Sequence, residues 1–200
     1  AGLDTQAVPR SETETLINDF FQGTFGRTTD AVKEGQHRVK SMALIHQKLY
    51  SADDVRGVNV QGYLEQLCSE LFKAFGVDQE KVGWKIDTSN LRLDIDTVIP
   101  LGLIINELIS NSLKYAFPEG RAGEINISFR SLNNDEYEII VSNDGVNFPR
   151  DLNFRNTESL GLRLVTNLAE KQLHGKIELN RSKGTEFKIR FKEIKYKKRV

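Results

Sequence analysis

The chain has 200 residues, of which 38% are hydrophobic, and its 28 lysines and arginines balance 28 aspartates and glutamates. This length suits one ordinary domain with an appendage, or two small domains. The net charge of zero argues against binding to nucleic acid or to an anionic membrane surface. The single cysteine excludes an internal disulfide framework, and no apolar run reaches the roughly 20 residues of a membrane-spanning helix. We therefore expect a soluble fragment without direct membrane contact, located in the cytoplasm.

The N-terminal part has the pattern of two helices. Residues 11–25 carry apolar side chains at helical spacing, and a turn that contains glycine leads to a second helical pattern over 29–51. Two helices with a short link predict a helical hairpin over residues 1–54. Such hairpins can pair into four-helix bundles, so a homodimer is one expected state, and a monomer is the other because the first helix is short.

Residues 55–194 have the pattern of one domain, and residues 195–200 form a basic tail. Helices and strands are segregated enough to favour an α+β two-layer sandwich over a parallel, doubly wound sheet. The strand segments alternate β-branched or aromatic residues with polar ones at a period of two. The predicted helices span 60–76, 97–117 and 160–173, and the predicted strands span 81–87, 123–131, 136–143, 176–182 and 185–191.

The segment NELISNSLKYAF, residues 106–117, places polar residues on a helix that otherwise has the pattern of a core element. A helix turns by about 100° per residue, so Glu107, Asn111 and Lys114 lie within roughly 60° of one another on the helical wheel. A solvated surface face is a sufficient explanation for these three residues taken alone. The opposite, apolar side carries Val98, Leu101, Ile105, Leu108, Ile109 and Ala116.

A segment of over a dozen residues without periodicity follows the strand that ends at Asn143. Loops of that length in compact domains are usually functional or disordered. The segment ends at Ser159 and Gly161, which open an apolar helix. Backbone N–H groups at such a helix start can bind phosphate, with the helix dipole assisting. Together with the polar residues of 106–117, this segment favours a phosphate-containing ligand.

Four motifs, in this order and at these separations, resemble the N, G1, G2 and G3 boxes of sensor histidine kinases: NELISNSLKYAF, NDGVNFP, SLGLRLV and GTEFKIRF. The preceding HRVKSMALIHQKLYSADD resembles the second dimerisation helix of the subfamily whose acceptor helix has the sequence His-His-Arg-Val-Lys-Asn-Asn. The resemblance covers residues from about 30 to 191. It implies a transmitter region with the GHKL, or Bergerat, ATP-binding fold, in which a mixed sheet packs on three helices after a helical hairpin.

The resemblance implies ATP and Mg²⁺ as cofactors. In this family the asparagine that matches Asn111 supplies an amide oxygen to Mg²⁺, which suits a hard cation. Lys114 matches a phosphate-facing position, and Glu107 matches the candidate base that polarises the acceptor imidazole. These roles fit phosphoryl transfer, where catalysis is largely positioning and charge neutralisation. The resemblance implies further nucleotide contacts at Asn143, Asp144, Gly145, Gly161, Leu162 and Thr185.

One box departs from the family pattern, which usually has Asp-Asn-Gly-x-Gly where this chain has Asn-Asp-Gly-Val-Asn at residues 143–147. The adenine-binding carboxylate is thus replaced by Asn143, a neutral acceptor that gives up a charge-assisted contribution on the order of 1 kcal/mol. Asp144 is the alternative adenine contact. Because neighbouring strand residues point to opposite faces, that alternative requires a local slip of the backbone.

The chain contains three histidines, His37, His46 and His174. His46 shares the apolar side of its helix, which predicts a packed core histidine, and His174 precedes Gly175 in a turn that suits a helix C-terminus. His37 begins HRVK, as in the acceptor motif, but is followed by SMALIHQKLY instead of Asn-Asn. His37 is therefore the candidate phosphoacceptor within the chain, while the motif register favours an acceptor that lies upstream or is altered.

The expected function is that of an ATP-dependent protein histidine kinase in two-component signalling. The fragment would bind Mg-ATP, pass the γ-phosphate to a histidine and then to a response-regulator receiver domain, under the control of an upstream sensor domain. The alternative is a non-catalytic regulatory or phosphotransfer scaffold with weakened nucleotide binding. An ATPase or an anti-sigma-type serine kinase uses the same sandwich but does not need the HRVKSMALIHQKLY helix.

Overall fold

The computed structural model describes residues 57–194 except positions 90, 134 and 158. The predicted helical hairpin, with His37 and His46, and the basic tail lie outside the described residues. The elements in chain order are β1 (Val58–Asn59), α2 (Val60–Ala74), β2 (Val82–Thr88), β3 (Arg92–Leu93), α3 (Ile95–Tyr115), the 3₁₀-helix η1 (Pro118–Gly120), β4 (Gly123–Ser131), β5 (Glu136–Asn143), α4 (Leu160–Asn167), the π-helix η2 (Leu168–Gln172), β6 (Lys176–Asn180) and β7 (Thr185–Lys192).

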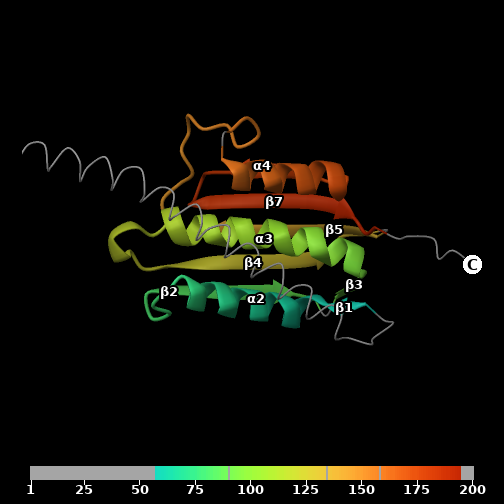
Figure 1. Ribbon diagram of the computed structural model, residues 1–200, viewed down its shortest axis with the longest axis horizontal. Coiled ribbons are helices and arrows are strands. Elements are labelled where there is room, and N and C mark those ends of the chain that lie inside the picture. Colours follow the sequence, from blue (N-terminus) through green and yellow to red (C-terminus); the bar gives the residue numbers. More distant parts are fainter. Residues whose placement is uncertain (1–56, 90, 134, 158, 195–200) are drawn as a thin grey trace, which may run out of the picture. The chain divides into compact units, whose positions relative to one another are not determined.

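Five strands form one mixed sheet in the order β2-β4-β5-β7-β6 (Figure 1). Strands β2 and β4 run parallel, and every other neighbouring pair is antiparallel. A separate ribbon pairs β1 with β3. The sequence did not predict this ribbon, because each of its strands has only two residues, too few to display a period.

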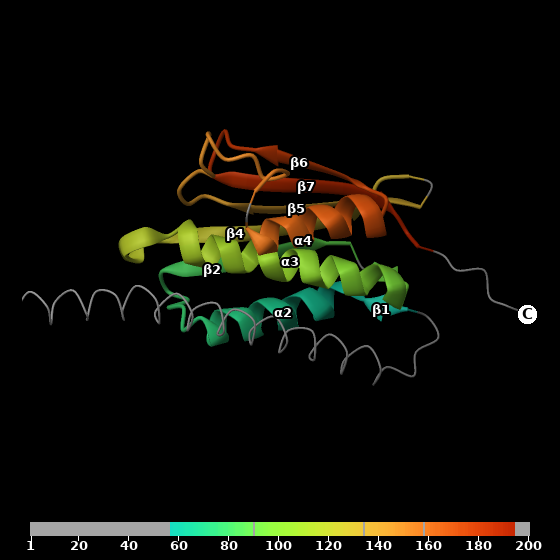
Figure 2. The same cartoon turned by 45° about the horizontal axis from the view of Figure 1, so that its top comes forward.

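The helices α2, α3 and α4 lie side by side over one face of the sheet (Figures 1 and 2). The strand sequences explain why the helices of residues 57–194 cover this one face. In β4 the alternate residues Ile125, Ile127 and Phe129 are fully buried toward the helices, while the residues between them are more exposed. The predicted α+β sandwich, a mixed sheet packed on three helices, is confirmed.

On the open face of the sheet, one carboxylate is buried by arginines from the two neighbouring strands. Glu138 of β5 accepts a hydrogen bond from Arg190 Nε of β7 at 2.8 Å and lies 3.5 Å from Arg130 Nε of β4. This partner raises the pKa of the Arg190 guanidinium, because the hydrogen bond favours its charged form. Cross-strand charge pairs of this kind stabilise the sheet without an apolar cover.

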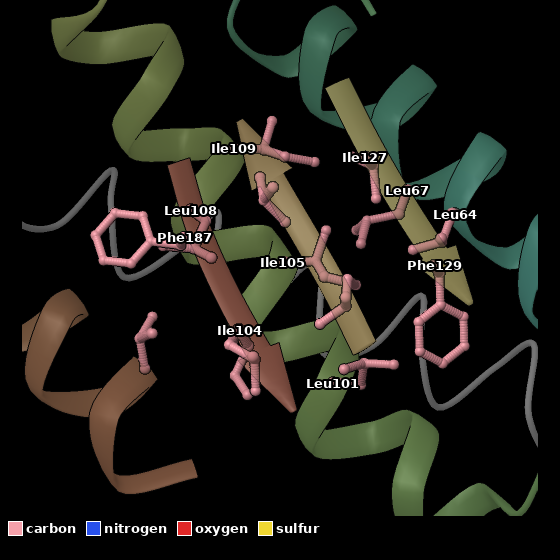
Figure 3. Close-up of a cluster of buried hydrophobic side chains, with 14 of the residues drawn as sticks. Leu64, Leu67, Leu101, Ile104, Ile105, Leu108, Ile109, Ile127, Phe129 and Phe187 are labelled. Atoms are coloured by element: carbon pink, nitrogen blue, oxygen red, sulfur yellow. The ribbon is translucent and has the colours of Figure 1, made fainter. Parts of the chain in front are cut away.

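The core lies between the sheet and the three helices, and α3 is its centre. Figure 3 shows side chains of α3 with Phe187 of β7 on one side, and with Leu64 and Leu67 of α2 beside Ile127 and Phe129 of β4 on the other. Cys68 of α2 is a buried core side chain, and burial raises the pKa of its thiol to about 12. All six apolar residues predicted for the core side of α3 are buried: Val98, Leu101, Ile105, Leu108, Ile109 and Ala116.

Helix ends follow local capping chemistry. The side chain of Asn59 accepts a hydrogen bond from Gly62 N at 3.0 Å, and that of Asp94 accepts one from Asp96 N at 3.1 Å, so both helices begin at satisfied N-caps. The third predicted helix, 160–173, continues as a π-helix after Asn167. His174 follows it with a left-handed φ of 49°, which agrees with the predicted helix C-terminus. No helix in the described part of the chain combines the length and apolar content needed to cross a bilayer.

The central position of α3 gives a stability prediction. Ile109→Ala should lower the free energy of unfolding by about 2–5 kcal/mol, because the fully buried side chain leaves a cavity that the packed sheet and helices cannot fill. Urea denaturation with linear extrapolation measures this loss. Leu160→Ala is the matched control, since Leu160 is 66% exposed and its truncation should change stability by less than about 0.5 kcal/mol. Equal losses in the two variants would contradict the packing described.

Candidate functional site

A cavity of about 370 Å³ lies beside the last turns of α3. Its walls come from α3, β5, β7, α4 and the segment 146–159, which joins β5 to α4 and which we name the lid segment. Ten of the 17 lining residues are apolar or aromatic and seven are polar, a mixture that suits a small-molecule site. The lining residues are Leu108, Asn111, Ser112, Tyr115, Ala116, Val141, Asn143, Val146, Asn147, Phe148, Pro149, Leu152, Thr157, Ser159, Leu162, Thr185 and Phe187.

The cavity brings together four of the residues that the sequence analysis selected. Asn111 of α3, Asn143 of β5, Leu162 of α4 and Thr185 of β7 come from four motifs, and all four line the same space. Five other selected residues do not line it: Glu107, Lys114, Asp144, Gly145 and Gly161.

Asn143 is a buried polar residue in the cavity wall, with 5% of its surface exposed. Its Nδ2 donates to Ser112 Oγ at 3.0 Å, and its Oδ1 accepts from Gly145 N at 3.1 Å. Ser112 Oγ in turn donates to Leu108 O at 3.0 Å. This chain of bonds ties the end of β5 to α3 and fixes the plane of the Asn143 amide.

Asp144 points out of the cavity. Its carboxylate accepts a hydrogen bond from Glu124 N on the neighbouring strand at 2.7 Å, and its backbone carbonyl accepts one from Arg121 Nη2 at 3.0 Å. Consecutive residues of an extended chain face opposite sides, so burial of Asn143 directs Asp144 outward. The backbone slip that would bring Asp144 into the cavity is not present.

The glycines of two motifs permit close backbone contacts beside the cavity. A Cβ on Gly145 would overlap the carbonyl oxygen of Ala116, which accepts a hydrogen bond from Val146 N at 2.8 Å. Gly184 has a left-handed φ of 78°, and a Cβ there would overlap the carbonyl of Asn143. Gly145 is therefore required for close approach of the lid segment to α3.

The expected single polar face of α3 is not observed. Glu107 is only 3% exposed, Asn111 is half-buried and Lys114 is exposed, so exposure rises along the helix instead of being uniform on one side. The helical wheel predicted an exposed Glu107 because it assumes that a helix is buried on one side only. Helix α3 is contacted on more than one side, since α2 and α4 flank it and the sheet lies beneath it (Figure 2).

Two arginines hold the lid segment against the rest of the domain. Arg181 donates from Nη1 to Arg150 O at 3.2 Å and from Nη2 to Leu152 O at 2.8 Å, and its guanidinium lies 5.2 Å from the centre of the Phe148 ring. Arg155, within the segment, donates from Nε to Glu170 Oε1 at 3.0 Å.

The sequence analysis missed Ser112 and Arg181. Ser112 lies four residues after Leu108 and four before Ala116 on the buried side of α3, and a small polar residue in that apolar row is a usable signal. Arg181 has no such signal, because its partners lie about 30 residues away in a segment without periodicity. Among the residues the structure describes, no group of three or more His, Cys, Asp or Glu side chains could hold a metal ion.

Two family models match the chain. One, described as histidine kinase, covers residues 16–75, and the other, described as histidine kinase-, DNA gyrase B-, and HSP90-like ATPase, covers residues 96–195, half of the chain. The chain belongs to the histidine kinase-, DNA gyrase B- and HSP90-like ATPase family. The second match includes every element that lines the cavity of this ATPase domain. The hairpin expected before the domain agrees with the first match.

Two curated proteins similar to this chain are histidine kinases. Sensor histidine kinase PdtaS of Mycobacterium tuberculosis is 26% identical over 164 residues, which make up 80% of this chain and 32% of that protein. Blue-light-activated histidine kinase 2 of Erythrobacter litoralis is 24% identical over 137 residues, 66% of this chain and 39% of that protein. The chain thus spans about a third of the length of these relatives.

Solved structures share the fold. The histidine kinase domain from Erythrobacter litoralis EL346 blue-light activated histidine kinase superposes with a TM-score of 0.71 at 21% identity, covering 88% of this chain and 81% of that chain. Acinetobacter baumannii histidine kinase AdeS gives a TM-score of 0.55 at 15% identity, covering 96% and 89%. The predicted GHKL-type sandwich is confirmed, and the match over residues 16–75 agrees with the predicted histidine kinase transmitter. The subfamily with the His-His-Arg-Val-Lys-Asn-Asn helix stays a prediction.

The arginine contacts of the lid segment give a prediction about its order. Arg181→Ala should speed hydrogen exchange at the amides of Leu152 and Asn156, whose hydrogen bonds to Pro149 O and Asn153 O lie within the segment that Arg181 holds. Exchange in α2 should stay unchanged. Lys183→Ala, an exposed residue of the same β6–β7 hairpin, is the control and should leave the lid amides as they are. Unchanged exchange in Arg181→Ala would contradict the anchoring role.

Proposed function

We propose that the chain is the transmitter part of a sensor histidine kinase, and that its cavity binds Mg-ATP. The observation that carries this proposal is the convergence of Asn111, Asn143, Leu162 and Thr185 on one cavity in a member of this ATPase family. The γ-phosphate of ATP would pass to a histidine and then to an aspartate of a response-regulator receiver domain. Control by an upstream sensor domain, pairing into a homodimer and a cytoplasmic location belong to the same proposal.

The residues of the cavity fit a nucleotide. The apolar side chains suit a purine ring, and Asn143 supplies a buried polar group beside them. Close backbone packing at Gly145 keeps side-chain bulk out of the junction between α3 and the lid segment. The lid segment is positioned to cover a bound nucleotide, and Phe148 N donates to Thr185 Oγ1 at 2.9 Å across the cavity wall.

Asn111 would hold the magnesium ion through its amide oxygen, a hard donor of the kind that Mg²⁺ prefers. Bound Mg²⁺ supplies charge neutralisation to the phosphates. Lys114, exposed in the last turn of α3, carries a positive charge of the sign that a phosphate contact needs. Glu107 lies one helical turn before Asn111, and its proposed role as the base toward an acceptor imidazole rests on the motif that it shares with the family.

A second candidate function is a regulatory or phosphotransfer scaffold of the same fold with weak nucleotide binding. One observation favours it: Asn143 is neutral, and its Oδ1 already accepts a hydrogen bond from Gly145 N. The two functions differ in the affinity of the chain for Mg-ATP, which calorimetric titration measures.

One prediction of the proposed function concerns Asn111. Asn111→Ala should weaken Mg-dependent ATP binding by more than about tenfold, because the proposed metal ligand is lost, while the melting temperature stays near that of the parent chain. Isothermal titration calorimetry with Mg-ATP measures the affinity. Asn167→Ala removes an exposed asparagine of α4 that does not line the cavity and should bind as the parent chain does. Unchanged affinity in Asn111→Ala would refute the assignment, and no measurable binding by the parent chain would favour the scaffold.

Another prediction of the proposed function concerns the phosphoacceptor. The residues after His37 depart from the acceptor motif, so this chain, given Mg-ATP, should not form an acid-labile phosphohistidine at a significant rate. Radiolabelled ATP should leave the parent chain and His37→Gln equally unlabelled. Labelling that disappears in His37→Gln would contradict the register argument and make His37 the acceptor.

A further inference from the structure

We propose that Asn143 makes the nucleotide site tolerant of both adenine and guanine. This inference rests on the proposed function, since it assumes that the cavity holds a purine nucleotide. It concerns the one buried amide of the cavity wall whose hydrogen bonds fix which of its ends is oxygen and which is nitrogen.

The orientation of the Asn143 amide follows from its two partners. Gly145 N–H can only donate, so the amide oxygen must face it, at 3.1 Å. Ser112 Oγ uses its single proton on Leu108 O, so it accepts from the amide nitrogen, at 3.0 Å. A flipped amide would place a donor against the Gly145 donor and an acceptor against Ser112, which would break both bonds.

The fixed amide retains one donor and one acceptor. Nδ2 carries two protons, of which Ser112 takes one, and Oδ1 has two lone pairs, of which Gly145 N–H takes one. The remaining proton and lone pair belong to a side chain that lines the cavity and is 5% exposed. A carboxylate at the same position would offer acceptors only.

The two purines differ in the sense of their hydrogen bonds at the 6 position. Adenine presents an amine donor there, and guanine presents a carbonyl acceptor. A carboxylate accepts from the adenine amine and repels the guanine carbonyl, so it discriminates through a repulsive contact as well as an attractive one. The Asn143 amide satisfies either group, through Oδ1 for the amine or Nδ2–H for the carbonyl, and thus lacks the repulsive contact.

Asp144 does not restore the discrimination. Its carboxylate is outside the cavity and accepts from Glu124 N at 2.7 Å. The exchange of residues between positions 143 and 144, relative to the family pattern, therefore moves the negative charge from the cavity wall to the surface. The same exchange has two consequences at position 143: the cavity wall loses a negative charge, and it gains the N–H donor of the Asn143 amide.

The test is calorimetric titration of the whole chain with Mg-ATP and with Mg-GTP, for the parent chain and for Asn143→Asp. In the parent chain, the dissociation constants for Mg-ATP and Mg-GTP should agree within about tenfold. Asn143→Asp should bind ATP severalfold more tightly than the parent chain does. Its ratio of GTP to ATP dissociation constants should rise by about tenfold or more. The matched variant Asn147→Asp adds the same charge at another residue of the cavity lining and should shift both affinities in the same direction.

Each other outcome contradicts a specific statement. Tight ATP binding with GTP more than about 100-fold weaker in the parent chain would overturn the base tolerance and leave the proposed function standing. An unchanged ratio in Asn143→Asp would show that Asn143 does not contact the base. Binding of neither nucleotide would overturn the proposed function, and the inference with it.

Discussion

The site depends on one backbone junction, where the end of α3 meets the start of the lid segment. Val146 N donates to Ala116 O at 2.8 Å, and the approach is close enough that only glycine fits at position 145. The junction places Asn143 opposite Ser112, so the hydrogen bonds among Asn143, Ser112 and Leu108 O can form. Because α3 is also the centre of the core, core packing fixes the position of the part of the cavity wall that α3 supplies.

Regular elements were the most predictable part of the fold. The bounds of β4 and β5 match the predicted segments, because apolar residues recur at every second position of both strands and one register buries them: Ile125, Ile127 and Phe129 in β4, and Tyr137, Ile139 and Val141 in β5. The helix predicted over 160–173 changes to a π-helix after Asn167, and nothing in its apolar spacing marks that change. The two-residue strands β1 and β3 are too short to carry a pattern at all.

Site residues that belong to a motif could be predicted from the sequence. The exposure of a site residue could not be predicted where tertiary packing decides it. Asn111, Asn143, Leu162 and Thr185 were found through motifs and do share a cavity. Burial of Glu107 could not be found on a helical wheel, since it depends on which helices flank α3. The outward direction of Asp144 followed from strand alternation, whereas the contacts of Arg181 with the lid segment depend on pairing between distant segments.

The central claim is that the cavity between α3 and the lid segment is the nucleotide site, and an ATP analogue with a photoreactive azide on its purine ring tests its location most directly. After irradiation of the chain with the analogue and Mg²⁺, peptide mass spectrometry should find the label on peptides that contain the cavity-lining residues of α3, β5 or the lid segment, and excess ATP should prevent labelling. Label on the open face of the sheet or on α2, or labelling that ATP does not suppress, would contradict the account.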